Sequence, residues 1–357
     1  MIRVLVVDDS LTVRRRLVEV LSHEPDLAVV GEAGDGRRAV ELTRTLRPDV
    51  ITLDLALPDM NGLAATEQIM AHVPTPILIV SASFNRGEMF DTYHALAAGA
   101  VDVLDKQGAN DATWEPRFVA AVRMVSRIKV ITHLRGRLDA ASPHHAAAAP
   151  CQRALAKPPG DGRGHAELLA LGASTGGPSA LVEVISAIAP TTPATLLVVL
   201  HIDEAFARSF ADWLGVQTAR PVRVAQDGEP VAGPPGQVLV APPGLHLVVD
   251  RGRTWLSSAA PRHHCRPSID VLFESIAHDY EARAAACLLT GMGRDGATGL
   301  LAIRRAGGFT IAQDEATSVV YGMPREAVAC DAADRVLPLS EIGPALELRV
   351  RRKDGAR

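Results

Sequence analysis

One serine in this chain stands among small residues, between a short apolar run and the predicted start of a helix. The apolar run is 168–171, the small residues surround Ser174, and Pro178 begins the predicted helix. Backbone N–H groups at a helix N-terminus point outward, so they can stabilise negative charge that develops beside this serine. Small-residue turns of this kind also bind phosphate groups, and this stretch alone leaves a nucleophile and a phosphate site equally open.

Two further polar residues follow apolar runs that are typical of strands. His201 follows the run 196–200, and Asp295 lies in the glycine-rich segment 290–297. Because the carboxyl ends of parallel strands meet at one edge of a sheet, Ser174, His201 and Asp295 can lie together there. His201 can then take the proton of the Ser174 hydroxyl, and Asp295 can fix the imidazole tautomer.

The two alternatives for the serine turn require different side chains. A phosphate site would favour a Lys or Arg in or just after the turn, and none occurs between Ala173 and Ile188. A phosphate site would also leave His201 and Asp295 without a role. The sequence therefore favours acyl transfer, with backbone N–H groups of the segment 291–296 as donors to the oxyanion.

A second group of polar residues is predicted at strand ends in the N-terminal part of the chain. Asp8 and Asp9 end the first predicted strand, Asp54 the third and Ser81 the fourth, and Lys106 follows the fifth. Three converging carboxylates repel one another unless a hard cation neutralises them, which indicates Mg²⁺ with oxygen ligands. Lys106 would add a fixed positive charge and Ser81 a hydroxyl.

Alternating strand and helix patterns predict two α/β domains, each with a doubly wound, mainly parallel sheet between two layers of helices. The first domain spans residues 1–125 and the second spans residues 166–350. In the first, strands are predicted at 3–7, 27–30, 50–54, 77–81 and 101–104, and helices at 11–22, 37–46, 63–70, 88–98 and 114–128. In the second, strands are predicted at 168–171, 195–200, 237–240, 286–289 and 309–312, with extra short strands around 245–256, and helices at 178–188, 204–214, 268–278, 297–305 and 324–330.

The composition changes between the two domains, over residues 126–165. This segment has few large apolar residues and contains four consecutive alanines, several glycines and the pair Pro158-Pro159. Such a composition is typical of a flexible linker, and its early basic part can continue the last helix of the first domain. Residues 351–357 are predicted to form a C-terminal tail.

The charge and the cysteines exclude several classes of protein. A net charge of −4 gives no electrostatic reason to expect a nucleic-acid or membrane partner. The four cysteines lie far apart without C-x-x-C spacing, which predicts a reducing compartment and no disulfides. The run His263-His264-Cys265 contains metal-ligand types, but no partner pair has suitable spacing, so a polar or packing role is favoured.

Neither a signal peptide nor a membrane span is predicted. The apolar residues 2–7 meet Asp8 too early for a signal peptide, and no later apolar run approaches the ~20 residues of a membrane span. We therefore expect a cytoplasmic protein without membrane insertion.

Residues 1–125 resemble the receiver domain of response regulators. The resemblance rests on Asp8-Asp9-Ser10, Leu53-Asp54-Leu55 with Pro58, Ser81-Ala82 and Asp105-Lys106. It implies a flavodoxin-like fold in which Asp54 is the phosphoacceptor, Asp8 and Asp9 hold Mg²⁺ together with it, and a histidine kinase is the phosphodonor. It also implies that Ser81 moves to meet the phosphoryl group and that Lys106 pairs with that group.

Two positions depart from the receiver pattern. Gln107 stands where the family usually has proline after its lysine, which changes the bond geometry expected of that loop. Val103 occupies the position where many relatives carry a switch aromatic residue. The second departure weakens any account of signalling by aromatic rotation.

With the second domain included, the chain resembles the chemotaxis protein-glutamate methylesterases over almost its whole length. Their order of receiver, linker and esterase is the same, and the matching segments are 172–178, 240–244 with His246, 265–273, 290–297, 312–315 and 321–327. The resemblance implies a Rossmann-like esterase domain with Ser174 as nucleophile, His201 as base and Asp295 as orienting acid. It also implies that the Met292 N–H donates a hydrogen bond to the oxyanion. Thr175 matches the active-site turn of the family, and the alternative interpretation is that its hydroxyl caps the following helix.

These features predict a two-domain response regulator that hydrolyses glutamate methyl esters on methyl-accepting chemoreceptors and can also deamidate receptor glutamines. Phosphorylation is expected to loosen a receiver domain that covers the Ser174 cleft, and no cofactor is expected in the esterase domain. Two alternatives stay open. One is a phosphorylation-switched binding module without useful catalysis, and the other is an esterase that acts on a substrate other than a receptor.

Overall fold

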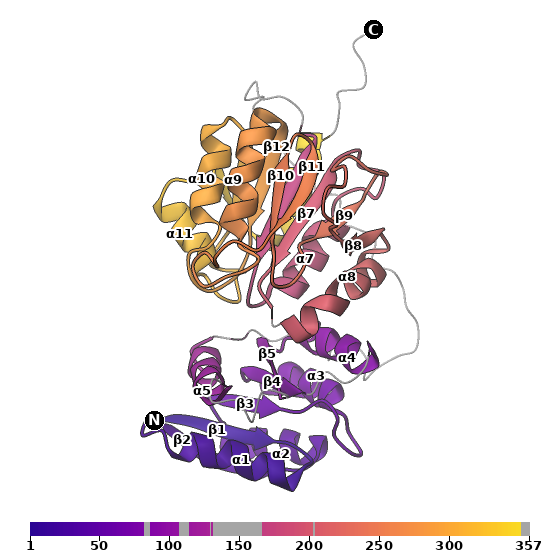
Figure 1. The fold of residues 1–357 in the computed structure, drawn as a ribbon. Helices are drawn as coiled ribbons and strands as arrows, with labels where there is room; N and C mark the ends of the chain where they lie inside the picture. The colour runs from indigo at the N-terminus through magenta and orange to yellow at the C-terminus, as the bar shows by residue number, and fades with distance from the viewer. Residues whose placement is uncertain (82–85, 107–113, 129, 131–165, 203, 351–357) are drawn as a thin grey trace.

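The structure is a computed structural model that describes residues 1–81, 86–106, 114–128, 130, 166–202 and 204–350, in two α/β domains (Figure 1). In the first domain, five parallel strands lie in the order β2-β1-β3-β4-β5, with an apolar core on each face of the sheet. This is the predicted doubly wound, flavodoxin-like arrangement. Its elements are β1 (Ile2–Val7), α1 (Leu11–Ser22), β2 (Leu27–Ala33), α2 (Gly36–Leu46), β3 (Val50–Leu53), α3 (Gly62–His72), β4 (Ile77–Ser81), α4 (Arg86–Ala97), β5 (Asp102–Asp105) and α5 (Trp114–Val125).

Short polar side chains determine where the first three helices begin. Ser10, Asp35 and Asn61 each accept a hydrogen bond from the backbone N–H three residues further on, at the starts of α1, α2 and α3. Such a cap stabilises a helix by about 1 kcal/mol, because it satisfies an N–H group that has no partner within the helix. The predicted helix starts in this domain therefore agree with the structure to within one or two residues.

The second domain contains seven parallel strands in the order β14-β13-β12-β6-β7-β9-β8. Its first strand, β6, lies in the middle, because the chain builds one half of the sheet from β7 to β9 and then crosses to β12. The strand order reverses beside β6, and ligands of such sheets bind at the carboxyl ends of the strands at this point. The elements are β6 (Leu168–Ala173), α7 (Gly177–Ser186), β7 (Thr195–Leu200), α8 (Glu204–Thr218), β8 (Val222–Val224), β9 (Val238–Val240), β10 (His246–Asp250), β11 (Arg253–Ser257), α9 (Ile269–Asp279), η2 (Glu281–Arg283), β12 (Ala284–Leu288), α10 (Ala297–Arg305), β13 (Phe309–Gln313), α11 (Met323–Ala329), β14 (Arg335–Leu337) and α12 (Leu339–Val350).

Alternate residues of the central strand β6 face two different helix layers. Leu169 and Leu171 belong to the apolar core formed with α7, α8 and α12, while Leu168 and Ala170 belong to the core formed with α9, α10 and α11. Successive side chains of a strand point to opposite faces, so an uninterrupted apolar run is what a sheet covered on both faces requires. This explains why the strands of the second domain read as continuous apolar stretches.

The extra short strands predicted around 245–256 are present as an antiparallel pair, β10 and β11, outside the main sheet. Other parts of the second domain differ from the predictions. The edge strands β8 and β14 were not predicted, because each has only three residues and none of them is buried, which leaves no clear periodicity. Helix α12 was also missed, since it contains Pro344, a residue that normally interrupts a helix.

The two domains contact each other through aromatic side chains of α4 and α8. Tyr93 of α4 is fully buried, with its ring centroid 5.0 Å from that of Trp213 and 5.5 Å from that of Phe210. Its hydroxyl donates a hydrogen bond to the carbonyl oxygen of Phe206. One apolar cluster therefore continues from the first sheet into the second domain.

Parts of the sequence prediction lie outside the described residues. These are most of the predicted linker 126–165, the tail 351–357 and Gln107, so the domain boundaries stay predictions. Within the part of the chain that the structure describes, no helix has the length and apolar character that crossing a membrane requires.

Candidate active site

The register of two neighbouring strands brings Ser174 and His201 to the same place. Ala173, the last residue of β6, pairs with Leu200, the last residue of β7. Ser174 and His201 are the next residues of these strands, and the His201 N–H donates a 3.0 Å hydrogen bond to the Ala173 carbonyl oxygen. Paired parallel strands lie ~4.8 Å apart, so the two residues are neighbours at one sheet edge, as predicted.

The loop after β12 holds the serine turn from the other side of β6. The Ser174 N–H donates to the carbonyl oxygen of Thr290 at 3.0 Å. The Thr290 hydroxyl donates to the Thr175 carbonyl oxygen at 2.9 Å and accepts from the Val320 N–H at 2.9 Å. These bonds fix the backbone around the serine without using its hydroxyl.

Glycine at position 291 allows this close approach. A Cβ atom placed on Gly291 would lie 2.6 Å from the Ser174 Cβ and 2.4 Å from the Met323 Cε, which is closer than real side chains come. The backbone of the 290–297 loop can therefore reach the serine only because position 291 has no side chain.

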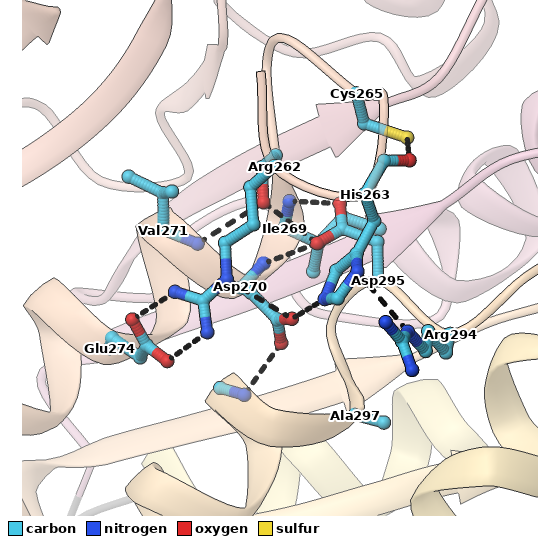
Figure 2. Close-up of polar contacts among 12 residues, drawn as sticks. Arg262, His263, Cys265, Ile269, Asp270, Val271, Glu274, Arg294, Asp295 and Ala297 are labelled. Atoms are coloured by element: carbon cyan, nitrogen blue, oxygen red, sulfur yellow. Dashed lines mark hydrogen bonds and ion pairs between the residues drawn. The ribbon is translucent and has the colours of Figure 1, made fainter. Parts of the chain in front are cut away.

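Asp295 is buried at the N-terminus of helix α9 (Figure 2). Its Oδ1 accepts hydrogen bonds from the Ser268 hydroxyl at 2.7 Å and the Asp270 N–H at 3.1 Å, and its Oδ2 accepts from the Ile269 N–H at 2.7 Å. Burial alone would raise the pKa of Asp295, but His201 and these donors outweigh it and hold the pKa below its usual range. The carboxylate is therefore ionised and fixed in one orientation.

His201 faces this carboxylate on one side and a cysteine on the other. Its Nε2 lies 3.0 Å from Asp295 Oδ2, and its Nδ1 lies 3.8 Å from Cys265 Sγ. Burial lowers the pKa of His201, but the Asp295 carboxylate and the Cys265 sulfur outweigh it and raise the pKa to about 9. In this arrangement the imidazole carries a proton at neutral pH, and it must lose that proton before it can act as a base.

Ser174, His201 and Asp295 thus lie at one edge of the sheet, and one of the two contacts that a triad needs is formed. His201 and Asp295 are paired, whereas no hydrogen bond joins the Ser174 hydroxyl to His201 within the described chain. Thr175 does not cap helix α7, because Gly176 is the cap residue, and the Thr175 hydroxyl instead lies 3.5 Å from Asp102 of the first domain.

The charged cluster of the first domain also forms as predicted. Carboxylate oxygens of Asp8, Asp9 and Asp54 lie within 4.8 Å of one another, and the first and last of these residues are buried. Lys106 Nζ lies 2.6 Å from Asp8 Oδ2 and 2.8 Å from Asp54 Oδ2. Ser81 ends β4 beside them, and its carbonyl oxygen accepts a 3.0 Å hydrogen bond from the Lys106 N–H.

Comparison with known proteins identifies both domains. Residues 169–346 match the family model of the CheB methylesterase, and residues 4–114 match that of the response regulator receiver domain. The protein-glutamate methylesterase/protein-glutamine glutaminase 2 of Anaeromyxobacter dehalogenans is 44% identical over 97% of this chain and 96% of its own length. The chain belongs to the CheB methylesterase family.

Another relative and one solved structure are similar to this chain. The protein-glutamate methylesterase/protein-glutamine glutaminase of Nitrosospira multiformis is 40% identical over 97% of this chain and 96% of its own length. The CheB methylesterase catalytic domain of Thermotoga maritima is 34% identical, covers 51% of this chain and 98% of its own, and has a TM-score of 0.49. Membership of the CheB family confirms the prediction of a methylesterase that follows a receiver domain.

Two residues beside the CheB site were not assigned a role from the sequence. Both lie in the segment 265–273, which matched the family without a catalytic role, yet Ser268 holds Asp295 and Cys265 contacts His201. A serine directly before a helix start signals a helix cap, and Ser268 does accept from the Val271 N–H. That signal could have placed a hydroxyl at the start of α9, although not its contact with Asp295.

The receiver cluster of this CheB protein fits a hard divalent cation. Asp8 Oδ2 is a buried carboxylate oxygen that no hydrogen bond satisfies, although the Lys106 ammonium lies beside it. Burial is the main cause that raises the pKa of Asp8; the Lys106 ammonium offsets part of this effect, and the Asp54 carboxylate raises the pKa further. A bound cation would offset the negative charge of the three carboxylates. Carboxylate oxygens are also the ligand type that Mg²⁺ prefers.

We predict that Ser268→Ala lowers kcat for ester hydrolysis roughly 10- to 100-fold with little change in KM, because a hydrogen bond to a charged group contributes about 1.5–3 kcal/mol. Ser268→Thr, which keeps the hydroxyl, should restore most of the rate. Steady-state kinetics of methanol release check this. The matched control is Ser275→Ala on the same helix, whose hydroxyl bonds Leu272 and Val249 instead; an equal loss of rate in that variant would contradict a specific role for Ser268.

Proposed function

We propose that this protein hydrolyses methyl esters of glutamate side chains on methyl-accepting chemoreceptors, with Ser174 as the nucleophile. The observation that carries the proposal is the shared sheet edge of Ser174 and His201, with the buried Asp295 paired to the imidazole. The names of the relatives also include protein-glutamine glutaminase, so we extend the proposal to receptor glutamines at the same site.

The proposed reaction has two halves. Ser174 Oγ attacks the ester carbonyl carbon as His201 takes the hydroxyl proton, and the intermediate then expels methanol, which leaves with that proton. Water attacks the acyl-serine, again through His201, and the free carboxylate leaves as the Ser174 hydroxyl is regenerated. Since Nε2 of His201 faces Asp295, Nδ1 is the nitrogen that exchanges the proton with Ser174 and water.

We propose the Met292 N–H as a donor to the oxyanion. Gly291 brings this part of the backbone against Ser174, and no hydrogen bond within the described chain engages the Met292 N–H. A donor held in place before the reaction stabilises the developing negative charge without reorganisation, and loss of one such donor typically costs 10²–10³-fold in kcat.

For the receiver domain we propose phosphorylation of Asp54 by a histidine kinase. Asp8, Asp9 and Asp54 would hold Mg²⁺, which neutralises the charge of the incoming phosphoryl group. Lys106 lies 2.8 Å from Asp54 Oδ2, where its ammonium group can pair with a phosphoryl oxygen. Ser81 ends the neighbouring strand, and we propose that its hydroxyl moves to meet the phosphoryl group once Asp54 is phosphorylated.

We place the kinase, the receptor segments and this protein in the cytoplasm.

The proposed regulation follows from the position of the receiver domain over the esterase edge. A cavity of about 470 Å³ has His201 and Cys265 in one wall and Val103 and Asp102 of the receiver in another. Thr175 and Ser179 of the esterase also contact Asp102 and Leu96 of the receiver. A receptor helix could reach Ser174 only after this contact loosens, which is the change that we assign to phosphorylation.

The aromatic contact between the domains offers a route for this change. Val103 stands where relatives carry the switch aromatic, but Tyr93 on α4 supplies a buried ring that packs on Trp213 and Phe210 of the esterase. Movement of α4 after phosphorylation of Asp54 would then change the packing against α8 directly.

Ser174→Ala should abolish methanol release from methylated receptor membranes, because the variant lacks the attacking hydroxyl. Ser186→Ala, at the exposed C-terminal end of helix α7, which follows Ser174 in the chain, is the matched control and should keep the wild-type rate. The measurement is volatile label released from methyl-labelled membranes. Full activity in a folded Ser174→Ala variant would show that Ser174 is not the nucleophile. If the wild type hydrolyses a simple methyl ester but not methylated receptors, its substrate is another protein or molecule.

Asp54→Asn should remove stimulation by a small-molecule phosphodonor such as acetyl phosphate with Mg²⁺, since the amide cannot accept the phosphoryl group. The unphosphorylated rate should stay unchanged. Asp59→Asn, a nearby exposed carboxylate, serves as the control and should respond like the wild type. Equal rates of the wild type with and without phosphodonor would rule out the proposed gating.

Tyr93→Ala should raise the esterase rate of the unphosphorylated protein toward that of the phosphorylated protein. Loss of a buried aromatic ring costs about 3–5 kcal/mol of packing free energy, and part of this loss would weaken the contact between the two domains. Tyr93→Phe, which loses only the hydroxyl, should give a smaller rise. Esterase assays with and without phosphodonor measure both. Phe118→Leu, in the receiver core away from the contact, controls for general destabilisation and should not raise the rate.

A further inference from the structure

Two exposed arginines stand next to the residues that contact the proposed base. Arg266 follows Cys265, whose sulfur lies 3.8 Å from the His201 imidazole. Arg294 precedes Asp295, whose carboxylate pairs with the same imidazole. The net charge of the whole chain is −4, so this local concentration of positive charge does not follow from the composition. We call Arg266 and Arg294 the basic rim of the site.

The basic rim is held by uncharged partners. Arg266 donates to the carbonyl oxygens of Ser258 and Ala259, and no ion pair joins either arginine of the rim to a carboxylate of the described chain. Several other arginines of the esterase domain do form ion pairs, namely Arg223 with Glu229, Arg262 with Glu274, Arg283 with Glu167 and Arg304 with Asp331. The charges of the rim are therefore available to another molecule.

A buried carboxylate helps to position Arg294. The His263 ring lies between Asp270 and Arg294 (Figure 2): its Nδ1 accepts a 3.2 Å hydrogen bond from Arg294 Nε, and its Nε2 lies 3.2 Å from Asp270 Oδ2. Asp270 is fully buried, and its Oδ1 accepts a 2.7 Å hydrogen bond from the Gly299 N–H. A long side chain that is ordered beforehand loses less entropy on binding, so Arg294 is prepared to bind an anion.

The cavity between the domains already brings one carboxylate near the rim. Arg266 and His264 of the esterase line this cavity of about 470 Å³ together with Arg117 and Asp102 of the receiver. Asp102 is the one acidic side chain among the described residues that line it. Withdrawal of the receiver, which we assign to phosphorylation, would remove this carboxylate and make room for a carboxylate of the substrate.

The proposed reaction itself produces carboxylates, because hydrolysis of each methyl ester leaves a free glutamate. Guanidinium groups bind carboxylates through charge-assisted, often bidentate hydrogen bonds. We propose that the basic rim binds carboxylates that neighbour the methyl ester on the substrate protein, so that esters in an acidic segment are preferred. Each hydrolysed ester then makes its neighbour a better substrate. The preference rests on the proposed esterase activity, whereas the binding of an acidic segment does not.

Peptide binding tests the basic rim without turnover. Two fluorescent helical peptides carry one glutamate methyl ester each, flanked four residues away on both sides by glutamates in the acidic peptide and by glutamines in the neutral one. Full-length Ser174→Ala, with acetyl phosphate and Mg²⁺, should bind the acidic peptide roughly 2- to 25-fold more tightly in dilute salt, because each exposed ion pair contributes a factor of about 1.5 to 5. Fluorescence anisotropy measures both Kd values. The difference should shrink in concentrated salt, which screens exposed charges.

Substitution of the rim identifies the groups that cause the preference. With both Arg266→Gln and Arg294→Gln added, the Ser174→Ala protein should bind the two peptides equally. The matched control is Arg305→Gln, which removes the same charge from an exposed position at the C-terminal end of helix α10 and should keep the preference. Equal Kd values before the rim is changed, or an unchanged preference afterwards, would overturn the proposal.

Hydrolysis by the wild type separates this proposal from the proposed function. Initial methanol release in the presence of phosphodonor should give a higher kcat/KM for the acidic peptide, mainly through a lower KM, and the variant without both arginines should lose the difference. Equal kcat/KM for the two peptides would overturn the preference and leave the esterase activity standing. Methanol from neither peptide, with the binding difference retained, would overturn the esterase activity and leave the binding surface standing.

An anionic membrane is the other partner that two exposed arginines could bind. Sedimentation with phosphatidylglycerol vesicles checks this, and the wild type should sediment no more than the variant without both arginines. Sedimentation that depends on the two arginines, without a preference for the acidic peptide, would assign the rim to a membrane surface and overturn the proposal.

Discussion

The burial of the Asp295 carboxylate is the constraint on which the esterase site depends. An ionised carboxylate away from water is costly unless hydrogen bonds replace its hydration. Here the Ser268 hydroxyl and the first N–H groups of helix α9 provide these bonds, at the positive end of the helix dipole. The start of α9, the path of the 290–297 loop and the orientation of His201 are therefore one linked arrangement. A change at any of these places would be transmitted to the His201 imidazole, the group that we propose as the base beside Ser174.

Strand order explains how much of this site could be predicted from the sequence. Ser174 and His201 each follow a buried parallel strand, and strands of this type end at a common edge, so local pattern was sufficient to bring them together. The contacts of Ser268 with Asp295 and of Cys265 with His201 join loops that are far apart in the sequence. They depend on the tertiary path of each loop, which has no periodic signal. The fold was predictable for the same reason, except at Pro344 and the three-residue edge strands, where local signals are misleading or too short.

The receiver domain shows a related limit. The resemblance to receiver domains identified Val103 as the position where many relatives carry a switch aromatic residue. The aromatic ring at the domain contact instead comes from Tyr93 of α4, one layer away. Whether a side chain faces its own core or a partner domain cannot be read from one amphipathic helix, since both surfaces are apolar.

The apolar cluster that continues from the receiver sheet into the esterase domain has a thermal consequence. Burial of apolar surface is driven mainly by the entropy of water near room temperature, and this driving force weakens on cooling. A contact of this kind therefore holds the two domains together less firmly in the cold than at moderate temperature. The restraint that we propose for the receiver is therefore expected to relax as temperature falls, so that the unphosphorylated protein loses proportionally less of its activity than the phosphorylated one.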